Sequence, residues 1–331
     1  MSGYHNQSLD RALGIVDAVA KTGVHALKIQ TYTPKTMTLD LDEREFHISD
    51  PNSLWVGNSL YKLYGEAHTP WRWHKPIFDR ARELGIIAFS TPFDETAVDL
   101  LESLEVPCYK IASFENTDLP LIRRVAATGK PMIISTGMAS IAELDDTVRA
   151  VRQAGGKDLI LLKCTSTYPA TADNTNILTI PHMRELFQCE VGLSDHTMGC
   201  GAATAAIAHG ATLIEKHFTL DKLLEGPDHI LSADPQEMKT IVSNRNEVFL
   251  GLGDGIKRPT PIEYKQINSQ RKAIFTRRKI KKGEVLSLDN ISIKGPGHGL
   301  LPKYLPVVLG KKVTEDIDND LPITWDVLLS N

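Results

Sequence analysis

One stretch of the sequence, residues 192–229, restricts the fold more than any other. It contains a short apolar strand that ends at His196, a run of small apolar residues typical of a helix packed closely on a sheet, and a second strand that ends near His217. A strand, a crossover helix and a strand form a parallel βαβ unit. The two histidines are therefore expected side by side at the carboxyl edge of a parallel sheet, where α/β proteins build their sites.

The rest of the chain repeats this alternation of strands and helices, which predicts a (β/α)₈ TIM barrel. The strand expected before the first helix, which starts after Ser8, is missing from the sequence. Either the barrel is open at that point or the true start codon lies upstream; the upstream start is favoured, because an open barrel leaves two unpaired strand edges. The expected strands are 26–32, 86–91, 108–113, 131–136, 159–166, 190–195 and 212–218. The expected helices are 8–23, 71–84, 94–104, 118–128, 140–154, 181–187, 200–210 and 235–250.

The chain is expected to divide into a catalytic barrel, residues 1–255, a linker, 256–272, and a small tail domain, 273–331. Within the tail, the segments 280–291 and 317–328 resemble each other. Short strands and turns at this spacing predict a β-rich domain with pseudo-twofold symmetry. Such a domain is small for a core of its own, so we expect it to dock on a barrel, its own or a partner's.

An aromatic-rich insertion, residues 33–75, follows the first complete βα unit. In a barrel it belongs to the carboxyl-terminal face, where loops of this length carry substrate contacts or a lid. The alternative interpretation is a packed loop without contact to a substrate.

Composition excludes several classes of function. The 331 residues carry a net charge of −4, which gives no attraction to nucleic acid or to an anionic membrane. No apolar run approaches the roughly 18–20 residues of a membrane span, and no signal peptide is recognisable. The scattered cysteines favour buried thiols in a reducing cytoplasm over disulfides. They are Cys108, Cys164, Cys189 and Cys200.

Lysines and hydroxyl side chains recur where the expected strands end. A single Ser or Thr at such a position is usually ordinary strand sequence, but the whole set at one edge predicts a pocket for a small anion that bears phosphate or carboxylate. The residues at the strand ends are Lys28, Gln30, Ser90, Thr91, Lys110, Ser113, Glu115, Ser135, Thr136, Lys163, Thr165, Ser166, Tyr168 and Ser194.

The histidine pair has three interpretations: structural histidines, acid and base groups, or two ligands of a divalent metal. Two imidazoles leave coordination positions for water and substrate oxygens, so that a metal could polarise a carbonyl group as a Lewis acid. Asp195, Glu215 and Asp228 could orient the histidines or hold substrate hydroxyls. The sequence pattern leaves these alternatives open.

Many short motifs, in order, resemble the sialic acid synthase family, the phosphoenolpyruvate-condensing nonulosonic acid synthases. The stretch from Leu54 to Ile86 looks like the pseudaminic acid synthase branch of this family and its spore-coat polysaccharide relatives. The motifs are HNQS, LKIQTYT, FSTPFD, YKIAS, ISTGM, CTSTYP, GLSDHT, IEKHFT, GPDH and, in the tail, PGHG.

This resemblance implies a barrel followed by an antifreeze-like (SAF) domain, in a homodimer whose tail domains cap the partner's barrel. It implies a metal-dependent condensation of phosphoenolpyruvate with an amino sugar, most simply 2,4-diacetamido-2,4,6-trideoxy-L-altrose, to give pseudaminic acid and phosphate. His196 and His217 would hold Mn²⁺, or Mg²⁺ or Co²⁺, and Glu115 would handle protons. The phosphoenolpyruvate pocket would comprise Lys28, Thr91, Lys110, Ser113, Ser135 and Ser194.

Gln30 and Asp228 match sugar-side contacts of the family, and Ser166 lies in the CTSTYP motif beside the same pocket. In the tail the family usually has an arginine directly before PGxG; here Gly295 stands at that position and Lys294 precedes it as a partial substitute.

Other functions remain open from the sequence. The sugar could instead be the substrate of an N-acetylneuraminate or legionaminate synthase with the same mechanism. A Schiff-base aldolase would use Lys163 or Lys110 as its covalent amine. A truncated, non-catalytic relative is a third possibility, suggested by the missing strand and by Gly295.

Overall fold

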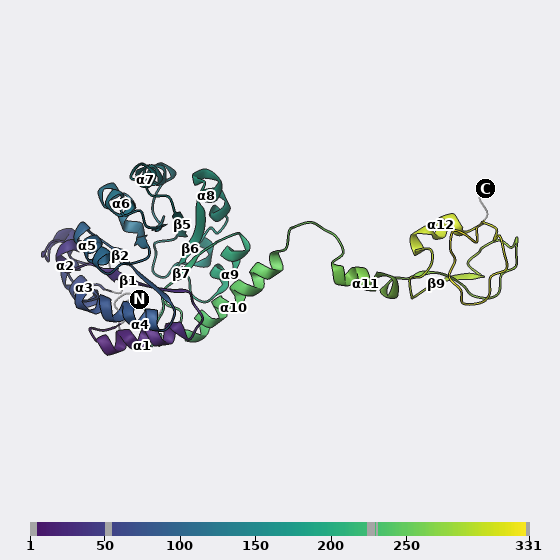
Figure 1. The fold of residues 1–331 in the computed structure, drawn as a ribbon, viewed down its shortest axis with the longest axis horizontal. Coiled ribbons are helices and arrows are strands. Elements are labelled where there is room, and N and C mark those ends of the chain that lie inside the picture. Colours follow the sequence, from purple (N-terminus) through teal and green to yellow (C-terminus); the bar gives the residue numbers. More distant parts are fainter. Residues whose placement is uncertain (1–4, 50–54, 224–228, 230, 329–331) are drawn as a thin grey trace. The chain divides into compact units, whose positions relative to one another are not determined.

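The chain forms two compact units, Met1–Gly253 and Asp254–Asn331, which Figure 1 shows as a computed structural model. Helix α11 (Pro261–Gln270) lies within the segment 256–272 that was predicted to be a linker. The helix is stabilised by a capping box of Thr260 and Glu263 and by proline at its first position. The described residues are 5–49, 55–223, 229 and 231–328.

The first unit is built on a parallel sheet whose strands neighbour one another in chain order. Every neighbouring pair is parallel, and the helices surround the strands (Figure 1). Each strand predicted from the sequence is present, most of them shorter than expected at one end or both. The strands are β1 (Ala26–Thr31), β2 (Ile87–Pro92), β3 (Tyr109–Ile111), β4 (Met132–Ser135), β5 (Leu159–Cys164), β6 (Glu190–Asp195) and β7 (Ile214–Lys216).

Local sequence signals explain where the helices begin and end. Ser8 caps α1 by accepting a hydrogen bond from the backbone N–H of Arg11, and Asp94 caps α5 in the same way. Gly210, the predicted end of α9, has a φ of +88°, which favours glycine. The helices of this unit are α1 (Leu9–Ala20), α2 (Pro34–Met37), α3 (Leu60–Ala67), α4 (His74–Glu83), α5 (Glu95–Ser103), α6 (Leu119–Ala126), α7 (Ile141–Gln153), α8 (Thr179–Phe187), α9 (Gly201–Ala208) and α10 (Pro235–Leu252). None of the described helices is long and apolar enough to cross a membrane.

The sheet has two different faces, because successive side chains of a strand point to opposite sides. The outer face packs against the helices and forms the large core of the unit. The inner face carries a small apolar cluster centred on Phe89, Ile133 and Leu162. By strand register, Lys110 and Glu215 lie on this same inner face. The interior therefore combines an apolar cluster with charged side chains.

The half-barrel is open between its first and last strands. No backbone pairing joins β1 to β7 in the described part of the chain, which confirms the predicted barrel that lacks one strand. A largely apolar cavity of about 430 Å³ lies along this seam, lined by residues of both edge strands. Polar contacts still cross it: the Nζ atom of Lys28 lies 3.4 Å from Oε1 of Glu215, and Arg245 donates to the His25 ring at 3.0 Å.

The insertion after β1 is packed against its surroundings. Gln7, in the opening loop, donates hydrogen bonds to the carbonyl groups of Glu66 and His68 at 2.8 and 3.0 Å. The ring of Tyr32, next to β1, contacts the Tyr64 ring edge to face, with centroids 5.8 Å apart. These contacts fix the insertion beside the end of β1. Its short 3-10 helices are η1 (Arg44–Phe46) and η2 (Trp71–Trp73).

The second unit has the pseudo-twofold symmetry predicted from its internal repeat. Ile280 and Ile317, the first residues of the two repeats, exchange backbone hydrogen bonds of 2.8 and 2.9 Å. The two repeats are offset by the 37 positions that separate 280 from 317. With this offset Val285 corresponds to Pro322, and Lys312 corresponds to Phe275. The bridge between Val285 and Lys312 therefore has its symmetry equivalent in the bridge between Phe275 and Pro322. The regular elements are β8 (Ala273–Thr276), β9 (Ile291–Lys294), η5 (Pro302–Tyr304) and α12 (Leu305–Val308).

Gly192 in β6 gives a test of the packed interior. A Cβ atom there would lie 2.2 Å from the carbonyl oxygen of Leu213 and 2.8 Å from Leu162, so Gly192→Ala should destabilise the barrel by about 2 kcal/mol or more. Urea unfolding followed by tryptophan fluorescence measures this loss. Gly201→Ala is the matched control, because its Cβ would meet nothing within 4 Å and it lies in α9. Equal stability of the two variants would contradict the packing described here.

Candidate active site

The carboxylate of Glu215 lies at the centre of a charged cluster on the inner face of the sheet. Its Oε1 atom accepts a hydrogen bond from Nζ of Lys110 at 2.9 Å and one from Oγ of Ser194 at 3.3 Å, and it pairs with Lys28 at 3.4 Å. These groups come from β1, β3, β6 and β7, so one carboxylate links strands from both sides of the open seam. Lys110 is almost completely buried, with 2% of its side chain exposed.

Glu215 is held in its ionised form by the two lysines. Burial alone would raise the pKa of Glu215, but the ammonium groups of Lys110 and Lys28 hold it well below its usual range. The carboxylate is therefore ionised at neutral pH. Two ammonium groups thus converge in a mostly buried pocket, where they could meet the negative charges of an anionic ligand.

A second group of donors lies beside this cluster, around Gly137. The backbone N–H of Gly137 donates to Oγ of Ser113 at 3.2 Å. A Cβ atom on Gly137 would meet Oγ of Ser113 at 2.9 Å and Oγ of Ser166 at 2.1 Å, so a larger residue would displace these hydroxyl groups. Two predicted substrate-binding serines, from loops after β3 and β5, thus converge on one backbone amide.

Three predicted site residues have buried polar atoms without a hydrogen-bond partner among the described residues: Oγ1 of Thr91, Oγ of Ser135 and Oε2 of Glu115. Buried polar atoms are rarely left unsatisfied in a folded protein, because each one costs roughly 1–3 kcal/mol. Unsatisfied atoms at the carboxyl ends of neighbouring strands are typical of a pocket that a ligand completes.

Glu115 follows β3 in the short helix η3 (Ser113–Glu115). Burial raises the pKa of its carboxyl group to about 7, and the nearby charge of Asp118 acts in the same direction. A carboxyl group with this pKa can gain or lose a proton at neutral pH, which suits a proton-handling role.

The predicted juxtaposition of the two histidines is present. Their ring centroids are 5.4 Å apart, and the ring of Tyr168 lies 4.4 Å from His196 and 6.1 Å from His217. Nδ1 of His196 lies 2.9 Å from the carbonyl oxygen of Thr165, to which it must donate a hydrogen bond. In the neutral ring this tautomer leaves Nε2 with a lone pair that can bind a metal. Burial lowers the pKa of His196, but its contacts with Cys164 and Thr165 raise it overall, so metal binding at this ring would have to displace a proton.

His217 is also suited to be a ligand. Burial, followed by the neighbouring His196 and Lys28, lowers its pKa well below the usual range, so its ring is neutral at physiological pH. Neutral imidazole is the form that binds metal ions. Among the residues that the structure describes, no group of three or more His, Cys, Asp or Glu side chains forms a metal cage, so the protein would supply the two imidazoles and leave other positions open.

Several strand-end residues have structural roles instead. Ser90 donates to the carbonyl group of Ile29 at 3.0 Å, and Thr136 donates to that of Leu162 at 2.9 Å. Lys163 donates to the carbonyl group of Cys164 and to Thr165, at 2.9 and 2.8 Å, and register places it on the helix-facing side of the sheet.

The remaining predicted residues are distributed as follows. Gln30 lies opposite Thr91 in the register of β1 and β2. Asp195 faces away from the interior and pairs with Lys216. Lys294 is exposed at the end of β9 in the second unit, and Asp228 lies outside the described residues.

The sequence alone did not identify Glu215 as the central group, nor Gly137 as a contact. The signal for Glu215 was present, because it lies two residues before His217 and therefore on the same face of the strand. Gly137 follows the strand-end pair Ser135 and Thr136, but strand-end position says nothing about which loops approach it closely.

A half-open parallel barrel with a charged, hydroxyl-rich carboxyl edge is the architecture of a barrel enzyme. The chain belongs to the NeuB family, which matches residues 15–257, and residues 271–329 match the SAF domain. The resemblance to the sialic acid synthase family is thereby confirmed, together with the predicted antifreeze-like tail.

Named relatives cover almost the full chain. Pseudaminic acid synthase of Helicobacter pylori is 39% identical over 98% of this chain and 95% of its own length. N,N'-diacetyllegionaminic acid synthase of Campylobacter jejuni is 34% identical over 96% of this chain and 95% of its own. The crystal structure of N-acetylneuraminic acid (sialic acid) synthetase from Leptospira borgpetersenii has a TM-score of 0.71 at 28% identity and covers 80% of this chain and 87% of that one.

Replacement of Glu215 by Gln tests its role as the counter-charge. The variant leaves Lys110 buried beside Lys28 without a carboxylate, so we expect a loss of about 3 kcal/mol at pH 7 in urea unfolding. Because the folded-state pKa of Glu215 lies below its unfolded value, its contribution is complete above about pH 5 and disappears as the pH falls below about 4. The stability difference between wild type and variant should shrink in that range.

Glu102→Gln is the matched control, because Glu102 pairs with Lys130 at 2.6 Å in a half-buried position outside the barrel. It should cost less than about 1 kcal/mol. A loss for Glu215→Gln no larger than that of the control would refute the central role of this carboxylate.

Proposed function

We propose that this protein is a nonulosonic acid synthase that condenses phosphoenolpyruvate with an amino sugar aldehyde. The sugar proposed from the pseudaminic acid synthase relatives is 2,4-diacetamido-2,4,6-trideoxy-L-altrose, which would yield pseudaminic acid and phosphate. The observation that carries the proposal is a buried cluster of cations and unsatisfied hydroxyl groups that lies beside the paired histidine rings. It provides one subsite for an anionic donor and one for an electrophile.

In this reaction the C3 carbon of phosphoenolpyruvate forms a bond to the aldehyde carbon of the sugar. The aldehyde oxygen takes up a proton, water adds at C2, and the C–O bond to phosphate breaks so that inorganic phosphate leaves. Both substrates must be held in register, which supplies a large part of such a rate enhancement.

The anionic donor would be bound by the cations and hydroxyl groups of the inner face. Lys28 and Lys110 would meet its negative charges, and the unsatisfied hydroxyl groups would donate to its oxygens. The residues proposed for this subsite are Lys28, Thr91, Lys110, Ser113, Ser135, Ser166 and Ser194. Gln30 and Asp228 are proposed to contact the sugar.

His196 and His217 would hold a divalent metal ion, most simply Mn²⁺, with Mg²⁺ or Co²⁺ as alternatives. The fixed tautomer of His196 and the neutral ring of His217 support this assignment. When bound, the ion would polarise the carbonyl group of the sugar's open-chain aldehyde. The histidines themselves fix where that carbonyl group can lie.

The relatives favour this reaction over the other candidates. A Schiff-base aldolase would need a lysine amine free of other bonds, but Lys163 is engaged on the helix side and Lys110 is paired with Glu215. The similarity to the legionaminic acid synthase of Campylobacter jejuni keeps a different amino sugar as the second candidate. Phosphate release measured with a panel of amino sugars separates these possibilities.

We also propose a cytoplasmic homodimer in which the tail unit of one protomer caps the barrel of its partner. Lys294, exposed at the end of β9, would then approach the partner's sugar subsite. The cysteines, all free thiols in the structure, are compatible with a reducing compartment.

His217→Ala should abolish phosphate release from phosphoenolpyruvate while the protein stays folded. The assay is run with a panel of amino sugars, before and after dialysis against EDTA, and we expect activity to return with Mn²⁺. His182→Ala, an exposed histidine on α8, is the control and should behave as wild type. Wild-type turnover by His217→Ala, or full activity in EDTA, would rule out the metal site; turnover without phosphate release would rule out the synthase.

The raised pKa of Glu115 predicts the pH dependence of catalysis. If the neutral carboxyl group donates the proton to the aldehyde oxygen, kcat should fall as the pH rises through about 7. Glu115→Gln should lower kcat about 100-fold and remove this part of the pH profile. The role of Glu115 is disproved if the variant keeps the same inflection near pH 7.

A further inference from the structure

A second buried ion pair lies directly behind the histidines, on the opposite face of the sheet. Nζ of Lys216 lies 2.7 Å from Oδ2 of Asp195, and their side chains are 2% and 0% exposed. The two residues are paired in the register of β6 and β7. Asp195 directly precedes His196 and Lys216 directly precedes His217, so the ion pair connects β6 and β7 one residue before each histidine.

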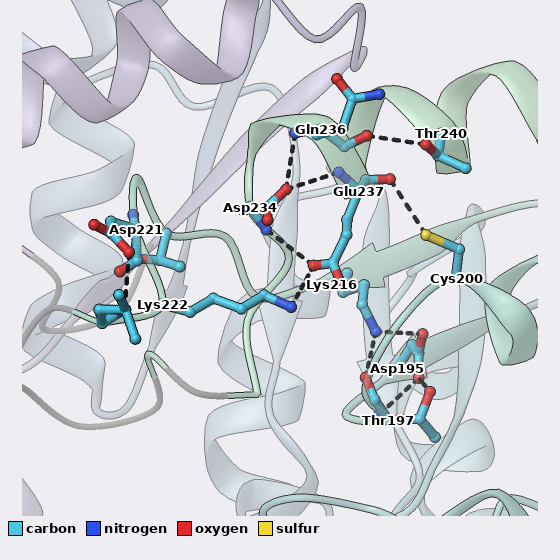
Figure 2. Close-up of polar contacts among 12 residues, drawn as sticks. Asp195, Thr197, Cys200, Lys216, Asp221, Lys222, Asp234, Gln236, Glu237 and Thr240 are labelled. Carbon is cyan, nitrogen blue, oxygen red and sulfur yellow. Dashed lines mark hydrogen bonds and ion pairs between the residues drawn. The ribbon is translucent and has the colours of Figure 1, made fainter.

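Thr197, on the other side of His196, belongs to the same cluster. Lys216 donates to its carbonyl oxygen at 2.6 Å, and Oδ1 of Asp195 accepts from its backbone N–H and its hydroxyl group at 2.9 and 2.7 Å. Figure 2 shows Lys216 reaching both Asp195 and Thr197. His196 is therefore held between two residues that are both bonded to the strand that carries His217.

Each histidine is also fixed from a third direction through its own backbone. The carbonyl group of His196 accepts from the N–H of Ala170 at 3.1 Å, and that of His217 accepts from Ala233 at 2.8 Å. Ala233 precedes Asp234, which caps α10, and Figure 2 shows the capping bonds of Asp234. On the outer face, the Asp195–Lys216 pair is the direct side-chain link between the ends of β6 and β7 among the described residues.

Stability alone is a weak explanation for this pair. Burying two charges costs several kcal/mol of desolvation each, and apolar side chains of similar volume are often equally stable or better at such positions. The neighbouring outer-face positions are in fact apolar, since Leu193 and Ile214 belong to or pack on the large core. Apolar side chains could not hydrogen-bond to the backbone of Thr197. The charged groups do so at the point where β6 and its backbone hydrogen bonds to β7 end.

We propose that Asp195 and Lys216 are positioning residues that set the spacing and orientation of His196 and His217, and thereby the affinity for the divalent cation. This inference rests on the proposed metal-dependent function. Both side chains lie on the outer face of the sheet, so they would act through the backbone of the histidines. Removing a residue that supports a metal ligand from behind typically lowers metal affinity or activity by about 10- to 100-fold.

The test replaces both charges at once, in the double variant Asp195→Asn and Lys216→Met. No unpaired charge is then left buried, and the introduced amide oxygen can still accept the bonds from Thr197. Mn²⁺ binding is titrated by the electron paramagnetic resonance signal of free Mn²⁺, and kcat, the KM for phosphoenolpyruvate and the urea midpoint are measured on the same preparations.

We expect Mn²⁺ binding about tenfold weaker than in wild type and kcat lowered about tenfold. The KM for phosphoenolpyruvate should stay within about twofold, because Lys28 and Lys110 are unchanged. The control is the double variant Glu102→Gln and Lys130→Met, which removes another ion pair, of 2.6 Å, away from the histidines. It should bind Mn²⁺ as wild type does.

Wild-type Mn²⁺ affinity and kcat in the Asp195/Lys216 double variant would overturn the proposal, since they would mean a merely structural pair. If that variant does not fold, Thr197→Val, which removes one hydroxyl bond to Asp195, takes its place with an expected affinity loss of about threefold; wild-type affinity there overturns the proposal as well. Failure of the wild-type protein to bind Mn²⁺ would instead refute the proposed metal-dependent function.

Discussion

The bond between Glu215 and two lysines is the interaction on which the rest of the site depends. Lys110 could not remain charged in the interior without a carboxylate, because burial of an unpaired ammonium group is too costly. The same carboxylate reaches Lys28 across a seam that backbone hydrogen bonds do not close in the described chain. Glu215 therefore links the two edges of the half-barrel and holds both lysines on the inner face.

Strand periodicity explains how a few residues carry both the chemistry and its support. In β6 and β7, alternate residues face the interior and the helices, so Ser194 and Glu215 enter the pocket while Asp195 and Lys216 lie behind it. Shifting either strand by one residue would exchange these sets and put both a buried ion pair and the histidines on the wrong faces. The register of this single strand pair is thus specified from both sides at once.

Part of this arrangement followed from the sequence. The adjacency of His196 and His217 could be predicted because a βαβ unit brings the carboxyl ends of its strands together, and the tail symmetry because 280–291 and 317–328 repeat. The role of Glu215 could not be predicted. Strand periodicity gives the face on which a side chain lies, but it does not say which lysines of distant strands reach that side chain. For the same reason Ser90 and Thr136, which look like pocket residues by position, turn out to bond to backbone carbonyl groups.

The Asp195–Lys216 pair and the cluster around Glu215 differ in a way that supports their proposed roles. Behind the sheet, one carboxylate meets one ammonium group, and the other bonds of the pair go to Thr197. In the interior, one carboxylate meets two ammonium groups among unsatisfied hydroxyl groups. The outer pair is bonded within the protein and fixes geometry, whereas the inner lysines lie among hydroxyl groups that a ligand could satisfy. The surroundings of the two clusters therefore support the separation between residues proposed to bind the substrate and residues proposed to hold the histidines in position.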